Sequence, residues 1–290
     1  MFRTSNPAMN NSAFAPAQTW VGSINPAATH EPGMREARAA VARSSTMSLQ
    51  GTVNKSALLI AICAVLAIVA WRMSFDASGQ LTSLGYASMF GGMIGGLILC
   101  LTTCIKPKWS PITAPIYAAF EGLFVGGISA MYAAYVPTSG ADAEGVRSML
   151  NTGLIFNAGL LTFGIFGGLL AAYSFKLIRP NRLFYNITLV GTLGVCAYGL
   201  IAFIASRFGA PSLASVYDPN NGGLISIGFS LLVVGLASMN LVLDFDLANN
   251  GIRNRAPKYF EWYAGFALLV TLVWLYVNLL QLLAKLQSRD

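Results

Sequence analysis

Seven apolar runs of about twenty residues each follow one another between Ala57 and Ala284. A helix needs about 20 such residues to cross the ~30 Å hydrocarbon core of a bilayer. Segments rich in proline, glycine or charge separate the runs. The predicted spans are 57–73, 84–105, 112–135, 149–175, 184–206, 224–243 and 259–284. The sequence therefore predicts an all-α membrane protein, with seven transmembrane helices in a bundle.

The composition excludes an ordinary water-soluble domain. Hydrophobic residues make up 55% of the 290 residues and charged residues only 10%, whereas a soluble domain has roughly 25% charged residues. Residues 1–46 differ from the rest, because they are rich in Ala, Ser, Asn and Pro without a sustained period. Such a segment cannot offset the entropy lost on ordering. We expect a flexible, disordered N-terminal tail over 1–46 and a transmembrane domain over 47–290.

Lysine and arginine are unevenly distributed between the two ends of the predicted spans. Thirteen of the eighteen precede the first span or follow the second, fourth and sixth, and the others are Arg72, Arg147, Arg207, Lys285 and Arg289. Positive residues that flank spans stay in the cytoplasm, so the N-terminus is predicted to be cytoplasmic and the C-terminus to lie on the opposite side. This sorting accounts for the net charge of +7. The expected partner is therefore the lipid bilayer and not a nucleic acid.

Small residues recur at spacings of three or four in three of the predicted spans, which is typical of closely packed membrane helices. This spacing places them on one helix face, where the backbones of two helices can approach closely. The positions are Gly91 with Gly95, Gly92 with Gly96, Gly164 with Gly168, and the stripe Ala118, Gly122, Gly126, Ser129 and Ala133. They predict a tightly packed bundle and carry no chemistry of their own.

Glu121 is an acidic residue near the middle of the third predicted span. It lies about ten residues past Pro111, which puts it roughly 15 Å into the bilayer at 1.5 Å per residue. A charge at this depth costs at least about 2.5–3.5 kcal/mol, so the side chain turns inward, pairs or is protonated. Two interpretations remain open: a functional carboxylate, or a protonated glutamic acid hydrogen-bonded between helices.

Two aspartates, Asp244 and Asp246, follow the sixth predicted span. Position alone makes Asp244 an exposed cap at the cytoplasmic edge, because the span 224–243 is already about 30 Å long. Helical spacing favours a side chain that points into the bundle, since Asp244 ends a small and polar stripe. This stripe is Ser226, Ser230, Val233, Ala237, Asn240 and Asp244. Asp246 lies about 200° further around the helix, so we expect it to face water.

Glu261 begins the last predicted span from the same cytoplasmic side and heads a stripe that continues with Ala264, Leu268, Thr271 and Asn278. Its structural explanation is electrostatic, because an acidic residue is stabilised near a helix N-terminus. Intramembrane carboxylates are also functional candidates by default, whereas asparagines inside spans often only join helices. The candidate residues for an ion pathway or pH sensing are Glu121, Asp244, Asp246 and Glu261, with Asn240 and Asn278 as supporting polar residues.

The residue types inside the spans argue against an enzyme. An intramembrane serine protease and a seven-helix zinc hydrolase both need histidine, but the only histidine, His30, lies in the tail. A retinal protein needs a mid-membrane lysine, and an aspartyl protease needs a second aspartate facing Asp244. No span offers either, and the four cysteines lie in or beside apolar runs, where they act as small hydrophobes. We expect no catalytic residue, no metal and no cofactor.

Three segments are similar to the bacterial branch of the Bax inhibitor family, also called the transmembrane Bax-inhibitor-motif or YccA-like family. They are "AAFEGLFVGGIS" in the third span, "LVLDFDL" at the end of the sixth, and "APKYFEWYAGFALLVTLVWLY" at the start of the seventh. "MSLQGTVNKSA" before the first span resembles the entry segment of the same branch. The resemblance covers about residue 47 to the end. It implies a seven-helix bundle with a central last helix, in the inner (cytoplasmic) membrane of a bacterium.

For some members the family resemblance implies a pH-sensitive leak of calcium ions. A pair of aspartates, one late in the sixth helix and one in the last, then acts as a proton-sensitive latch, with a glutamate of an earlier helix nearby. Asp244 matches the first aspartate, with Asp246 as an alternative register, and Glu121 matches the glutamate. The middle of the last span, "GFALLVTLVW", contains no carboxylate. Glu261 and Asn278 lie toward the two ends of that span, away from the missing position.

Two functions follow from these patterns. The first is a pH-sensitive calcium or cation leak, in which carboxylates facing a water-filled cleft supply the oxygen ligands that calcium prefers and bind a proton that closes the site. The second is a membrane regulator without transport activity, which binds another membrane protein such as the membrane protease associated with other bacterial members. A polar cavity open to the cytoplasm favours the first function, and a dry, packed centre favours the second.

Overall fold

The computed structural model describes residues 46–76, 79–136, 151–209 and 215–289. Within these ranges seven helices are long and apolar enough to cross a membrane, which confirms the predicted fold class. They are α2 (Leu49–Met73), α3 (Ser83–Ile105), α4 (Ser110–Tyr135, entered through the short helix η4, Pro107–Trp109), α5 (Thr152–Ser174), α6 (Arg182–Arg207), α7 (Leu224–Arg253) and α8 (Phe260–Gln287). The predicted tail and His30 lie outside the described residues, apart from Thr46.

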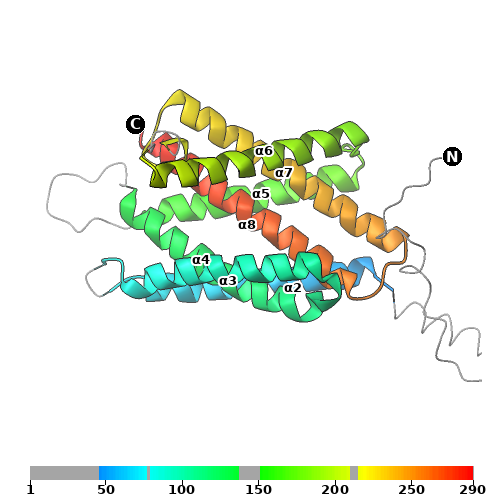
Figure 1. The fold of residues 1–290 in the computed structure, drawn as a ribbon. Coiled ribbons are helices and arrows are strands. Elements are labelled where there is room, and N and C mark those ends of the chain that lie inside the picture. The colour runs from blue at the N-terminus through cyan, green and yellow to red at the C-terminus, as the bar shows by residue number, and fades with distance from the viewer. Residues whose placement is uncertain (1–45, 77–78, 137–150, 210–214, 290) are drawn as a thin grey trace, which may run out of the picture. The chain divides into compact units, whose positions relative to one another are not determined.

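Two helices are longer than the apolar runs predict, and both extensions lie at the same end of the bundle (Figure 1). α2 begins at Leu49 rather than at residue 57, because the Ser48 hydroxyl caps it by accepting a hydrogen bond from Gly51 N at 3.1 Å. α7 continues to Arg253 rather than ending at 243, and Phe245 in this extension is buried in the core. A count of apolar residues misses amphipathic helix ends, so these two helices extend beyond the predicted spans.

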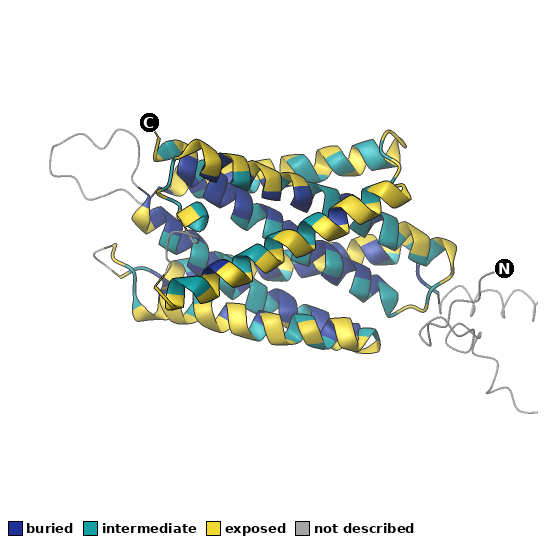
Figure 2. Cartoon of the chain, turned by 45° about the horizontal axis from the view of Figure 1, so that its top comes forward, coloured by how far each residue is buried: buried dark blue, intermediate teal, exposed yellow. Residues whose placement is uncertain are grey.

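α8 is the central helix, as predicted, and runs diagonally between the other helices (Figure 1). It packs against α2, α4, α5 and α7. Its different faces join separate apolar clusters: Leu269 meets α2 and α4, Leu275 meets α7, and Leu280 meets α4 and α5. α6 packs chiefly on α7 and exposes most of its length. Figure 2 shows the buried segments gathered in the interior and the exposed ones around it.

Close backbone approach joins α2 and α3 to α4, as the small-residue stripes predict. A Cβ added to Gly122 would lie 2.7 Å from Leu66 Cβ of α2, and one added to Gly92 would lie 2.7 Å from the carbonyl oxygen of Phe120. The same prediction is wrong for Gly91 of α3 and for α5, because an added Cβ at Gly91, Gly164 or Gly168 would meet nothing within 4 Å. Spacing identifies a face of small residues but does not tell whether another helix meets it.

Replacing Gly126 by alanine should lower the free energy of unfolding by about 1–3 kcal/mol, the usual cost of overpacking. The new methyl group would collide with the backbone carbonyl of Ala67 and force α2 away from α4. Gly164→Ala is the matched control, because its methyl group enters open space and alanine favours a helix over glycine. Thermal unfolding in detergent measures both variants. Equal loss of stability in the two would show that Gly126 is not a packing contact.

Candidate functional site

The four predicted acidic residues lie at four separate places in the bundle. Glu121 lies where α4 meets α3, Asp244 where α7 meets α8, and Asp246 among α5, α6 and α7. Glu261 lies where α8 meets α2. In the part of the chain that the structure describes, no hydrogen bond or ion pair joins any two of them, and no group of three or more His, Cys, Asp or Glu side chains could hold a metal ion.

Asp244 lies inside the bundle and not at an exposed helix end. α7 continues for nine residues beyond it, which is about 14 Å of helix. The carboxylate oxygen Oδ2 is buried and has no hydrogen-bond partner, and the hydroxyl of Thr271 on α8 faces the carboxyl group. The interpretation as an exposed cap is therefore wrong. A buried polar atom without a partner costs free energy, so it calls for a functional explanation.

The contact between α7 and α8 forms a seam that is polar at both ends and mostly apolar between them, where Asn278 is the polar residue on the face of α8 that carries Thr271 and Lys285. Asp244 and Thr271 mark one end, and fourteen residues away along each helix Lys285 Nζ donates a hydrogen bond to Ser230 Oγ at 2.7 Å. The interval is about 21 Å long. It is filled by buried apolar side chains, namely Ala237, Leu241, Leu275 and Leu279. We call this contact the α7–α8 seam.

Asp246 of α7 forms hydrogen bonds with both α5 and α6. Its carboxylate accepts hydrogen bonds from the hydroxyl of Tyr173 on α5 at 3.0 Å, from the hydroxyl of Tyr185 on α6, and from Asn250 Nδ2 at 2.8 Å. Asp246 is half-buried, so its carboxylate keeps some contact with the surroundings, as predicted, and makes these three hydrogen bonds as well. Because α7 runs past this point, the last turns of α5 and the first turn of α6 bring their tyrosines to the carboxylate.

Glu261 is completely buried and binds the beginning of α2. Its Oε1 accepts hydrogen bonds from both N and Oγ of Ser48 at 2.9 Å, and Lys258 Nζ lies 3.3 Å from the same oxygen. Lys55 Nζ forms an ion pair with Oε2. A side chain at Gly51 would collide with this carboxylate. We call these five residues the Glu261 clasp. The dipole of α8 alone does not explain this position, because Glu261 also binds the residue that caps the start of α2.

The segment that leads into α2 is held on the connection between α7 and α8. Met47 N donates a hydrogen bond to the carbonyl oxygen of Ala256 at 2.7 Å, and Thr46 forms an isolated bridge with Pro257. The Met47 sulfur lies against Gly251 near the end of α7. The clasp and this short pairing therefore fix the start of the transmembrane domain to the two helices of the seam.

Glu121 is enclosed by α3 and by its own helix. A Cβ on Gly96 of α3 would lie 3.0 Å from Glu121 Oε2, so the glycine makes room for the carboxyl group. The hydrogen-bond partner of Glu121 is the hydroxyl of Tyr117, one turn earlier on α4. Tyr117 in turn packs edge-on against Phe266 of α8, with ring centroids 4.9 Å apart. The partner of Glu121 thus lies on its own helix. The interpretation that Glu121 is hydrogen-bonded between helices is not supported.

Comparison with known proteins identifies the family of this chain. The family described as Bax inhibitor 1 like matches residues 6–288. The chain belongs to this family. The match reaches well into the tail, whereas the resemblance in the sequence covers only residue 47 onward. No curated protein and no solved structure matches the chain. The molecule is thus a multi-pass membrane protein of the Bax inhibitor-like family.

The two supporting asparagines of this Bax inhibitor-like protein act within and between helices. Asn240 Nδ2 donates hydrogen bonds to Thr192 Oγ1 of α6 at 2.8 Å and to the carbonyl of Leu236 at 2.9 Å. Asn278 Nδ2 donates to the carbonyl of Trp274 on its own helix at 2.7 Å. Neither amide contacts one of the four carboxylates, so both serve helix packing.

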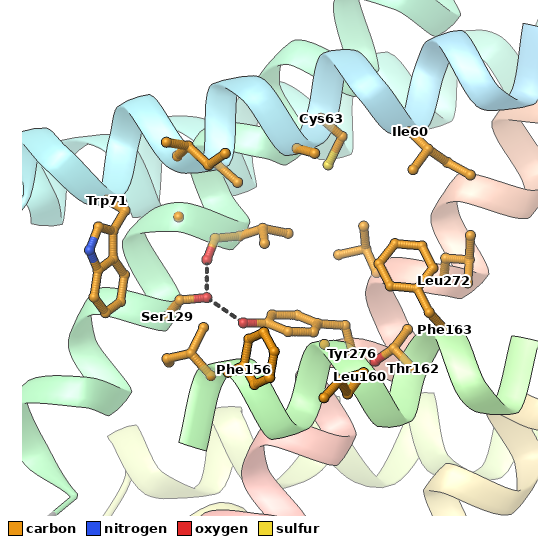
Figure 3. Close-up of a pocket in the computed structure, with 18 of the residues that line it drawn as sticks. Ile60, Cys63, Trp71, Ser129, Phe156, Leu160, Thr162, Phe163, Leu272 and Tyr276 are labelled. Carbon is orange, nitrogen blue, oxygen red and sulfur yellow. Dashed lines mark hydrogen bonds between the residues drawn. The ribbon is translucent and has the colours of Figure 1, made fainter. Parts of the chain in front are cut away.

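A cavity of about 620 Å³ opens between α2 and α5, with α4 and α8 behind it. Figure 3 shows its walls, which are almost entirely apolar and include Trp71, Phe156 and Phe163. Its polar feature is a hydrogen bond between Ser129 Oγ and the Tyr276 hydroxyl at 2.7 Å. None of the four acidic residues lines it. This hollow suits hydrocarbon rather than a hydrated ion.

Several functional contacts could not be identified from the sequence. Thr271 lies on the predicted inward stripe, but nothing marked it as the residue opposite Asp244. The tyrosines that bind Asp246 come from helices more than 60 residues away, and Lys55 pairs with a carboxylate 206 residues away. The segment "MSLQGTVNKSA" was distinctive enough to suggest the family. It gave no sign that its serine, glycine and lysine surround Glu261.

Replacing Glu261 by glutamine should lower the free energy of unfolding by about 3–5 kcal/mol, because it leaves the Lys55 ammonium unpaired in a poorly solvated place. Lys258→Ala removes the other cation from the same carboxylate and is the matched control. The Lys258 side chain is 47% exposed, so its loss should cost about 0–1 kcal/mol. Thermal unfolding of the two variants in detergent separates them. A small loss in both would contradict the role given to the clasp.

Proposed function

We propose that this Bax inhibitor-like protein is a pH-sensitive cation leak, with calcium as the transported ion, and that it has no enzymatic activity and needs no cofactor. The observation that carries the proposal is the state of Asp244. Glu121, Asp246 and Glu261 each have a hydrogen-bond or ion-pair partner for their carboxyl groups, whereas one oxygen of Asp244 is buried without any. A carboxyl group left in this condition inside a bundle is suited to take up a proton or a cation.

The proposed mechanism uses the α7–α8 seam as the gate. A proton on Asp244 removes its charge and gives the carboxyl group a donor, so the seam stays closed. Loss of the proton leaves a charge in a place that water does not reach, which favours entry of water and separation of α7 from α8. The carboxylate then offers oxygen ligands to a hard cation such as calcium. The Thr271 hydroxyl faces this carboxyl group from α8, and it donates its own hydrogen bond to the carbonyl oxygen of Ala267 at 3.3 Å.

Calcium influx into proteoliposomes tests this mechanism directly. The unaltered protein is expected to conduct more at pH 8 than at pH 6, and Asp244→Asn should abolish the difference because the amide does not titrate. Asp246→Asn is the control, since Asp246 lies near the same end of α7 but already accepts hydrogen bonds from Tyr173 of α5 and Tyr185 of α6. Glu121→Gln is measured beside them. Unchanged flux in both Asp244→Asn and Glu121→Gln would contradict the use of these carboxylates.

The pH dependence of calcium flux in variants of Thr271 gives a second test. Thr271→Val keeps the shape of the side chain but removes the hydroxyl that faces Asp244. The pH profile of the flux should shift, because the polar group beside the carboxyl group is lost. Thr271→Ser keeps the hydroxyl and should leave the pH profile in place. A profile that moves equally in both variants would assign the effect to packing.

We also infer that the protein lies in a bacterial inner membrane with its N-terminus in the cytoplasm and its C-terminus outside. The support comes from charge. The start of α2, the helix η4, the α5–α6 connection and the α7–α8 connection all lie at one end of the bundle (Figure 1). These are the segments that carry most of the lysine and arginine residues of the transmembrane domain, which favours the cytoplasmic side for that end.

A second candidate function is a regulator that binds another membrane protein, such as a membrane protease, and transports nothing. Two observations favour it: the middle of the α7–α8 seam is filled by apolar side chains, and the cavity of about 620 Å³ is apolar. The same flux experiment separates the two functions. A folded protein that shows no flux above empty liposomes at either pH would favour the regulator.

A further inference from the structure

Lys285 is buried near the end of α8, at the end of the seam opposite Asp244. Its exposure is 0%, although lysine is almost never fully buried unless it is paired. The sequence predicts a residue that flanks the last span, and the structure places Lys285 in the last turn of α8; its burial is not predicted. In the described part of the chain, the ion pairs involve Lys55 and Lys258 but not Lys285. Its charge must therefore be balanced in another way.

Neutral oxygen atoms surround the Lys285 ammonium group. Nζ donates hydrogen bonds to the carbonyl oxygen of Val216, to the carbonyl oxygen of Ser226 at 3.3 Å, and to Ser230 Oγ at 2.7 Å. We call these three oxygens the Lys285 cage. Backbone carbonyls and a hydroxyl are the ligands with which proteins replace the hydration shell of a bare cation. The cage thus has the chemistry of a cation site, filled by the protein's own ammonium group.

The segment that closes the cage is held in place independently of Lys285. Gln281, one turn earlier on α8, donates a hydrogen bond from Nε2 to the carbonyl oxygen of Tyr217 at 2.8 Å. The exposed carboxylate of Asp218, next in the chain, acts on Lys285 through its charge. Two side chains of the same face of α8 therefore bind the connection that leads into α7, and the negative charge outside the cage favours a cation within it.

We propose that the Lys285 ammonium is a tethered cation that fills an oxygen-lined cation site at the outer end of the α7–α8 seam and keeps free cations out of it. Its effect on transport rests on the proposed cation leak. A calcium ion that approaches this end meets a fixed positive charge in a medium of low dielectric constant, where repulsion is strong. The oxygens that it would need are already bound to Nζ. Lys285 is in this sense the residue that limits the leak.

The test replaces the tethered cation by a free one. Lys285→Ala removes three methylene groups and the ammonium, and n-propylammonium chloride supplies nearly the same atoms. Calcium flux through the variant in proteoliposomes should exceed that of the unaltered protein several-fold, and n-propylammonium should return it to the original level. 1-Propanol, which has the shape without the charge, and tetramethylammonium, which has the charge without N–H donors, are the controls and should not restore it.

A second readout does not depend on transport. n-Propylammonium should raise the midpoint of thermal unfolding of Lys285→Ala in detergent by a few degrees, while the unaltered protein should not respond. If Lys285→Ala does not fold, Ser230→Ala removes one cage oxygen and leaves the lysine in place. Its flux should then lie above that of the unaltered protein.

The outcomes separate the two proposals. An unaltered protein that leaks and a Lys285→Ala variant that leaks equally would overturn the role of Lys285 and leave the proposed leak standing. Absence of flux in every variant would overturn the leak, and the thermal measurement then decides on the cage. Stabilisation by n-propylammonium but not by the two controls supports a cation site there. Equal effects of all three compounds, or none, overturn it.

Discussion

A charge inside a membrane must find its partners within the protein, and the Glu261 carboxylate shows what this requires of the fold. It is completely buried and collects two hydrogen bonds from Ser48 and ion pairs with Lys55 and Lys258. These contacts need the first turn of α2 to lie against the first turn of α8. Once that junction is made, α8 runs into the bundle between α2, α4, α5 and α7. The central position of the last helix follows from where its first carboxylate is satisfied.

The two ends of the α7–α8 seam satisfy their polar groups in opposite ways. At one end Asp244 keeps a buried oxygen without a partner, and at the other Lys285 has three oxygen partners but no ion pair. The apolar residues between them, Leu241 and Leu275 among them, keep these groups about 21 Å apart. They cannot neutralise each other while the seam is closed. A movement that lets water into the seam would change the surroundings of both groups together.

The sequence alone predicts the number of helices and the inward stripes on α7 and α8, whereas the central last helix is what the family resemblance implies. These features depend on periods and lengths that are local in the chain. It fails where polar residues extend a helix, as at Leu49 and Arg253, because hydropathy does not count them. It also gives no sign of the hydrogen bonds that Asp246 and Lys285 make near the ends of their helices. Their partners, two tyrosines and a set of backbone carbonyls, come from other helices and leave no local pattern.

The Glu261 clasp joins residues that are synthesised far apart in time. Lys55 and Glu261 are separated by 206 residues, so at about 5–20 residues per second the first helix is made roughly 10–40 s before its partner. During that interval the Lys55 ammonium has no buried carboxylate to meet, and it can stay in the interfacial water beside the N-terminal end of α2. Closure of the bundle is then the last step of biogenesis. The arrival of α8 draws the lysine inward and completes the packing of a helix that entered the membrane first.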